Sequence, residues 1–209
     1  MAIQRATDAT PNEAEATPSE PRLRPFTVDE YYKMAEVGIL RPDERVQLIE
    51  GMVIQMPPGG PDHFSAVDWI AELFGDRLRS RVRIRVQGPI DLAERSHPEP
   101  DVALIRRPTT RGRAYRVTHP TGADLFLAIE VADSTLRFDL GEKALMYARH
   151  GVADLWVVDL QGDRVVVHRE PTSDGYGSVE SVMRGQSFSP LAFPDVPFSV
   201  DEILGGSEA

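Results

Sequence analysis

Three side chains in this sequence have the types and the spacing of a site that cleaves phosphodiesters. Glu130 lies inside the apolar run 125–131, which is short enough for a buried strand, and Asp101 opens a second apolar run directly after Pro100. A carboxylate buried without a partner is costly, so Glu130 needs a cation, either a side chain or a metal ion. Lys143 follows thirteen residues later and is one of only two lysines among 23 basic residues. Two strand-borne carboxylates and a lysine are the components of a metal-dependent phosphodiesterase site.

The lysine belongs to a predicted helix over 139–150. Asp139, Lys143 and Tyr147 are spaced four apart, which places them on one face of that helix. This face can point back at the end of the strand that carries Glu130. The same spacing also describes an ordinary exposed acid and base at i and i+4, worth about 0.2–0.5 kcal/mol, and the spacing alone leaves both interpretations open.

The patterns of the chain predict the elements that must position these residues. Apolar residues at helical spacing predict a long helix over 62–79, and strict alternation predicts a strand over 81–86 with one basic face. The other predicted elements are a capped helix over 27–36, a hairpin over 46–56 that turns at Glu50-Gly51, strands at 101–105, 125–131, 155–160 and 164–168, short strands between 186 and 198, and a last helix over 200–204. Their order fits an α/β domain with a mixed central sheet.

The whole chain has the composition of one ordinary globular domain. Its 209 residues are enough for a single core, so we expect one domain over 24–206 after an acidic, disordered tail over 1–23. No apolar stretch approaches the roughly 20 residues of a membrane helix, and signal-peptide features are absent, so we expect no membrane partner and a cytoplasmic protein. The absence of cysteines excludes disulfides and thiolate metal sites. The net charge of −10 argues against non-specific coating of nucleic acid, and a local basic groove remains compatible with it.

Seven short pieces of the chain, taken in order, carry a family resemblance. They are Leu48 through Gly51, Pro57 through His63, Glu99 through Val102, Glu130-Val131, the face of Asp139, Lys143 and Tyr147, Gly151-Val152, and Trp156 through Asp159. Together they resemble the Uma2 family, a branch of the PD-(D/E)XK nuclease superfamily, over roughly residues 24–204. The resemblance implies a restriction-endonuclease-like core, in which helices flank a mixed central β-sheet.

The resemblance also implies a set of site residues and a cofactor. By it, Asp101 and Glu130 hold a divalent ion with the backbone carbonyl of Val131, and Glu50 lies close enough to position a water or a second ion. Magnesium, or manganese in its place, suits such hard oxygen ligands and keeps several waters, one of which can become the nucleophile. Lys143 would orient that water and stabilise the charge that builds on the phosphate.

The lysine departs from the pattern of the superfamily, and other residues have plainer interpretations. The superfamily places the lysine two residues after the second acid, where this chain has Ala132, so the active lysine must come from the helix. Glu50 before a glycine is commonly a turn residue, and Asp101 after a proline can simply end a loop. His63 matches a family position, but a polar residue at a helix start needs no function, and we leave it out of the catalytic set.

Clustered arginines are the candidate contacts to nucleic-acid phosphates. They are Arg106, Arg107, Arg111, Arg113 and Arg116 in the loop after the Asp101 strand, and Arg81, Arg83 and Arg85 on the alternating strand. The loop is favoured because it follows directly from the strand of Asp101. A solvated loop in a chain that prefers arginine everywhere is the alternative.

The sequence therefore favours a magnesium-dependent endonuclease that cuts DNA with a metal-activated water. The rival is a non-catalytic DNA-binding or assembly module that keeps the nuclease fold, which the negative charge and the missing strand lysine both favour. Phosphodiester chemistry on RNA stays open. A homodimer is compatible with paired cuts, but no residue of the chain specifies an interface.

Overall fold

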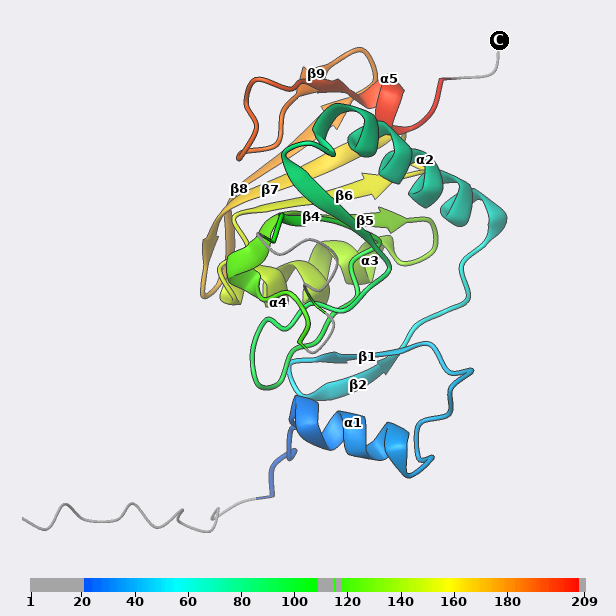
Figure 1. The fold of residues 1–209 in the computed structure, drawn as a ribbon, viewed down its shortest axis with the longest axis vertical. Coiled ribbons are helices and arrows are strands. Elements are labelled where there is room, and N and C mark those ends of the chain that lie inside the picture. The colour runs from blue at the N-terminus through cyan, green and yellow to red at the C-terminus, as the bar shows by residue number, and fades with distance from the viewer. Residues whose placement is uncertain (1–20, 109–114, 116–117, 207–209) are drawn as a thin grey trace, which may run out of the picture.

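A six-stranded sheet forms the centre of the computed structural model, which describes residues 21–108, 115 and 118–206. The strands lie in the order β3-β4-β5-β6-β7-β8, so strands that follow one another in the chain are neighbours in the sheet (Figure 1). They are β3 (Val82–Val86), β4 (Val102–Arg106), β5 (Leu125–Ala132), β6 (Asp154–Asp159), β7 (Arg164–Thr172) and β8 (Gly175–Met183). Every pair is antiparallel except β5 with β6, so the sheet is mixed, as predicted.

Helices cover both faces of this sheet (Figure 1). On one face lie α2 (Pro61–Leu78) and α5 (Val200–Ile203), and on the other lie α3 (Leu136–Phe138), the π-helical segment η2 (Asp139–Lys143) and α4 (Ala144–Arg149). Successive residues of a strand point to opposite faces, and β5 follows this rule. Leu127 and Ile129 join the core under α2, whereas Ala128 and Ala132 join the core under α4. Glu130 shares the parity of the second pair, so it faces the α4 layer.

A smaller layer lies at one end of the sheet (Figure 1). It consists of α1 (Val28–Glu36) and the hairpin of β1 (Val46–Ile49) and β2 (Met52–Gln55). Thr27 and Glu30 form the predicted capping box at the start of α1. Backbone hydrogen bonds tie this layer to residues 94–97; they join Val28 N to Glu94 O, Gly51 N to Arg95 O, and His97 N to Leu48 O.

Most of the predicted elements are confirmed, with small shifts at their ends. The long helix, the alternating strand and the strands around Asp101 and Glu130 all form. The structure adds β8, for which no strand was predicted, and the short helical turn η1 (Gly122–Asp124), and the short strands expected between 186 and 198 are β9 (Ser187–Phe188) and β10 (Phe198–Ser199). Within the described ranges no helix combines the length and apolarity needed to cross a bilayer. Most of the expected disordered tail over 1–23 falls outside the described residues.

Candidate active site

The pairing of β4 with β5 brings the two strand-borne acids together. The strands are antiparallel with Val102 opposite Ile129, so Asp101, one residue before β4, comes opposite Glu130. The carboxylate of Asp101 accepts a hydrogen bond from the backbone N–H of Val131 at 2.9 Å. This bond fixes the Asp101 side chain against the neighbouring strand, and the sheet register therefore sets the spacing of the two acids.

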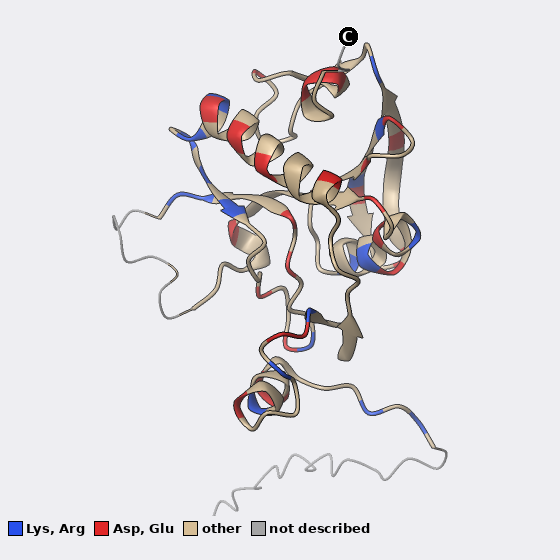
Figure 2. Cartoon of the chain, turned by 90° about the vertical axis from the view of Figure 1, so that its right-hand side faces the viewer, with Lys and Arg blue, Asp and Glu red and all other residues tan. Residues whose placement is uncertain are grey.

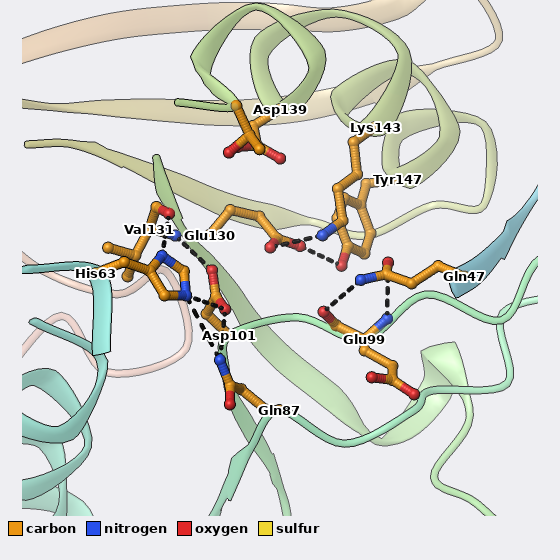
Figure 3. Close-up of polar contacts among 11 residues, drawn as sticks. Gln47, His63, Gln87, Glu99, Asp101, Glu130, Val131, Asp139, Lys143 and Tyr147 are labelled. Atoms are coloured by element: carbon orange, nitrogen blue, oxygen red, sulfur yellow. Dashed lines mark hydrogen bonds and ion pairs between the residues drawn. The ribbon is translucent and has the colours of Figure 1, made fainter. Parts of the chain in front are cut away.

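Glu130 has two hydrogen-bonding partners on the helix that faces it. Lys143 donates to Glu130 Oε2 from Nζ at 2.7 Å, and the Tyr147 hydroxyl donates to Glu130 Oε1 at 2.7 Å (Figure 3). Glu130 and Lys143 are each only 2% exposed. The helical face predicted from the four-residue spacing therefore points at the buried strand, and the alternative of an exposed acid–base pair is excluded.

A π-helical turn carries the lysine. The segment η2 spans Asp139 to Lys143, between α3 and α4. Such turns are rare and occur frequently at functional sites, because the wider turn re-aims the side chains around it. Asp139 is buried, accepts a hydrogen bond from the hydroxyl of Thr135, and projects toward the same space as Glu130 (Figure 3).

Burial and crowding shift the pKa values of these groups in different directions. Burial raises the pKa of Glu130 above its usual value, Lys143 opposes this effect, and Asp101 and Asp139 raise the pKa further. Burial would lower the pKa of Lys143, but the surrounding carboxylates, Glu130 first, raise it above its usual value. Burial also acts to raise the pKa of Asp101, but hydrogen bonding to His63 and the charge of Lys143 outweigh it, so that this pKa is lowered. The site therefore holds its carboxylates close together in a poorly solvated place.

His63 belongs to this cluster, although we left it out of the predicted catalytic set. Its Nδ1–H donates to the carbonyl oxygen of Val131 at 3.0 Å, and its Nε2 lies 3.3 Å from Asp101 Oδ1 (Figure 3). Gln87 donates to the same carboxylate oxygen at 3.2 Å. Gly59 makes room for the imidazole, because a Cβ atom there would lie 2.9 Å from the His63 ring. Hydrogen bonding to Asp101 raises the pKa of His63.

The cluster opens on a small pocket of about 50 Å³, which is room for a few water molecules. Asp101, Glu130 and Lys143 line it together with the N-terminal residues of α2. That end of α2 begins at Gly60, which makes no side-chain cap, and is followed by Pro61. Uncapped backbone N–H groups and the helix dipole favour an anion at such an end. The pocket therefore combines acids that suit a cation with a helix end that suits a phosphate.

The oxygen donors of the pocket fit a hard divalent cation. Asp101, Glu130 and the carbonyl of Val131 are oxygen ligands of the kind that magnesium prefers. His63 occupies one lone pair of that carbonyl and leaves the second available. Within the described residues no three or more His, Asp or Glu side chains are grouped closely enough to hold a metal ion by themselves. A bound ion would therefore keep several waters, as magnesium commonly does.

Glu50, the fourth expected member of the site, lies elsewhere. It occupies the hairpin turn with φ 50°, and its side chain bonds to His150 at 2.9 Å and to Arg149 at 3.3 Å. The Ser96 hydroxyl donates to the same carboxylate at 3.4 Å. Glu50 is not among the residues that line the pocket. The expectation that it positions a water or a second ion beside Asp101 is thus not supported, and its contacts are those of a turn residue.

The two expected arginine contacts that the structure describes, Arg106 and Arg107, lie at the far end of β4 and just beyond it. Arg106 pairs with Val82, five residues along the strand from Asp101, which corresponds to about 17 Å. Its guanidinium covers the ring of Phe126 at 5.4 Å, and Arg107 donates to the carbonyl of Arg79 at 2.6 Å. Basic residues do gather along β3 and at this end of β4 (Figure 2). Arg111, Arg113 and Arg116 lie outside the described residues.

Comparison with known proteins places this arrangement in a family. A family model described as "Putative restriction endonuclease", named Uma2, matches residues 28–201. The chain belongs to the Uma2 family. A crystal structure from Anabaena variabilis, titled as that of "a putative nuclease belonging to DUF820", is similar to this Uma2 protein with a TM-score of 0.64 and 17% identity, and the match covers 86% of this chain and 98% of that chain. The likeness shows that the Uma2 chain has a nuclease-like fold. A comparison with curated proteins finds no match.

Proposed function

We propose that this chain is a metal-dependent endonuclease that hydrolyses DNA phosphodiester bonds with a metal-activated water. The observation that carries the proposal is the buried pair of Glu130 and Lys143, held at 2.7 Å beside Asp101 on a pocket that admits water. A purely structural protein gains little from burying two charges, because the desolvation of such a pair offsets much of its attraction. The desolvation cost of this pair is explained if the two groups act on a charged substrate.

The residues divide the work by their chemistry. Asp101, Glu130 and the carbonyl of Val131 would hold magnesium or manganese. The ion, when bound, lowers the pKa of a water and draws charge from the phosphate. Lys143 donates one of its three N–H groups to Glu130, so the other two can donate to the attacking water and a phosphate oxygen. His63 holds Asp101 and the Val131 carbonyl in place from α2.

The rival function is a DNA-binding or assembly module without catalysis. Two observations favour it: the net charge is −10, and the lysine of the superfamily strand position is replaced by Ala132. The buried pair argues against such a module, because Lys143 brings from the helix the ammonium group that the strand lacks, and places it against Glu130. The two functions differ in whether Lys143 matters for turnover or only for folding.

A cleavage assay tests the proposal and separates it from the rival. Supercoiled plasmid, linear duplex, branched DNA and RNA are incubated with the protein and magnesium or manganese. We expect cleavage of DNA that Lys143→Met abolishes while DNA affinity stays within a few fold, because the lysine acts on the transition state. The conversion of plasmid to nicked or to linear product shows whether one copy or a pair makes the cuts.

The chain offers a matched control. Lys33 is the only other lysine and lies exposed on α1, so Lys33→Met removes the same charge far from the pocket. Cleavage by Lys33→Met at the rate of the unaltered protein, with none by Lys143→Met, supports catalysis. Full cleavage by Lys143→Met contradicts the assigned role, and an absence of cleavage under every condition, with intact DNA binding, favours the module.

A further inference from the structure

A second, larger hollow adjoins the catalytic pocket. It lies between α1, the segment that follows α1, and the β1–β2 hairpin, and its volume is about 400 Å³. The catalytic pocket and this hollow share four lining residues, namely Arg45, Gln47, Met56 and Glu99. The two spaces are therefore neighbours on either side of these residues, and a group bound in the hollow lies next to the place where a phosphate would be cut.

The size of the two spaces differs in a way that matters for a substrate. The catalytic pocket holds only a few waters, so the parts of a substrate beyond the reacting phosphate must lie outside it. The hollow falls in the range of roughly 300–1,000 Å³ that is typical of small-molecule sites. It has room for one nucleotide. A base that is stacked and paired in a duplex has to leave the stack before it can enter such a hollow.

The walls of the hollow suit a nucleobase. Tyr31 and Ala35 on α1, Leu40 in the following segment and Met56 after β2 give it one apolar and aromatic side, and the rest of its lining is polar. The Tyr31 hydroxyl donates to the carbonyl of Val46 at 2.9 Å, which holds the ring in place. Unpaired bases in nucleic-acid complexes are held by aromatic and apolar surfaces of this kind, together with hydrogen bonds to their edges.

Polar groups stand where the edge and the phosphate of that nucleotide would lie. Gln47 exchanges two hydrogen bonds with the backbone of Glu99, at 3.2 and 3.5 Å, and so fixes this strip between the two spaces. The carboxylate of Glu99 makes no hydrogen bond or ion pair with another described residue, which leaves it able to accept from base N–H groups.

Arg45 is the cation at the junction. Its side chain is exposed, donates to the carbonyl of Pro57 at 3.3 Å and lies 5.9 Å from the ring of Phe64. Within the described part of the chain it pairs with no carboxylate, whereas Arg41 beside it pairs with Asp43 and Glu44. Arg45 is therefore available to a phosphate oxygen, and it lines both spaces.

We propose that this hollow binds one unpaired nucleotide of the nucleic-acid substrate, adjacent to the phosphate that is cut. The preferred substrate class is thus single-stranded DNA, or duplex DNA with a nucleotide out of the stack, and fully paired duplex is disfavoured. The inference rests on the proposed nuclease function and adds the substrate class to it.

The test compares matched oligonucleotides with magnesium or manganese. One duplex is fully paired, a second carries one unpaired nucleotide, and a third carries an abasic residue at that position. We expect kcat/KM for the second to exceed the others by about tenfold, which lies within the range that stacking of one base contributes. Ala35→Trp fills the hollow and should remove this preference. Glu36→Trp adds the same bulk on a side of α1 that does not line the hollow and should keep it.

The outcomes separate the inference from the proposed function. If all three duplexes are cut equally, and Ala35→Trp behaves like the unaltered protein, the proposal that the hollow binds a nucleotide is wrong, and the proposed nuclease function is unaffected. If no substrate is cut, the nuclease proposal fails, and the same oligonucleotides are compared by fluorescence anisotropy. A preference for the unpaired nucleotide that Ala35→Trp removes then supports the hollow as a binding site, and equal affinities overturn it.

Discussion

Removing either member of the pair between Glu130 and Lys143 should destabilise the protein, and removing both should restore much of the loss. The charges lie 2.7 Å apart and are each 2% exposed, so their attraction is about 6 kcal/mol at an effective dielectric constant of 20. Desolvation offsets most of this attraction in the intact pair. Glu130→Gln leaves a buried ammonium without its partner, and we expect a loss of about 3–5 kcal/mol.

Lys143→Met should be milder and should depend on pH. Lys143 holds the pKa of Glu130 below the value that burial alone would give, so its loss raises that pKa further, and the acid in the variant takes up a proton when the chain folds at pH 7. Holding that proton at pH 7 costs about 3 kcal/mol relative to an unfolded chain in which the acid has its ordinary pKa, or about 6–12 °C in Tm. A folded pKa above the unfolded one gives stability that is lost as pH rises, so the deficit should shrink by about 1.4 kcal/mol for each pH unit below 7, until pH approaches 4.5.

Urea unfolding of the unaltered protein, both single variants and Glu130→Gln/Lys143→Met, at pH 7 and pH 5.5, measures these terms. We expect the double variant to lose much less free energy of unfolding than the sum of the two single losses, because it removes both buried charges at once. A double variant as unstable as that sum would refute the reasoning, since the two groups would then not stabilise one another. A deficit of Lys143→Met that ignores pH would refute the account of Glu130 protonation.

Four other outcomes follow from the positions of single residues. Magnesium at about ten times its Kd should stabilise the folded protein by about 1.4 kcal/mol, seen as a rise of several degrees in Tm, and Asp101→Asn should remove that response; an undiminished response would place the ion elsewhere. Arg107→Ala should lower stability by about 1 kcal/mol, because Arg107 donates to the carbonyls of Arg79 and Ser80 at the end of α2. The same variant should leave the salt dependence of DNA binding unchanged. Arg45→Ala should instead flatten that salt dependence by about 0.7–0.9 per lost contact, and binding across a salt series compares the two variants. Glu50→Ala should keep both cleavage and the magnesium response, because the side chain lies outside the pocket, and loss of either in a folded variant would return Glu50 to the site.

The parts of the site that the sequence predicted are those fixed by local periodicity. Glu130 was found because its apolar neighbours identify a buried strand, and strand alternation then decides which layer it faces. Lys143 and Tyr147 were found because helical spacing is regular enough to survive one π turn. In both cases the position of the side chain follows from residues of its own helix or strand.

The parts that the sequence did not predict depend on distant contacts. Glu50 and Gly51 both have positive φ in the hairpin, and the direction of the Glu50 side chain is set by His150, one hundred residues away. His63 gains its place from the carbonyl of Val131, and no local signal distinguishes it from any other polar residue near a helix start. The match of His63 to a family position was the one available signal.

The strand β8 was missed for a different reason. Gly175, Gly177, Ser178 and Ser181 have low strand propensity, so the pattern of the segment resembles a loop. Pairing with β7 along eight residue pairs forms the strand in spite of this composition. Tertiary pairing overrides local preference here, as it often does at the edge of a sheet.

The parallel pairing of β5 with β6 has a consequence for how the protein folds. Parallel strands require a crossover connection, and here that connection is the helix that carries Lys143 and Tyr147. The charged pair therefore lies within one contiguous strand–helix–strand unit, whose contacts are short in sequence and close at little entropic cost. Asp101 and His63 contact the same site from segments that lie earlier in the chain, outside this unit. We expect the unit to form early and the remaining residues to dock onto a lysine and glutamate that are already joined.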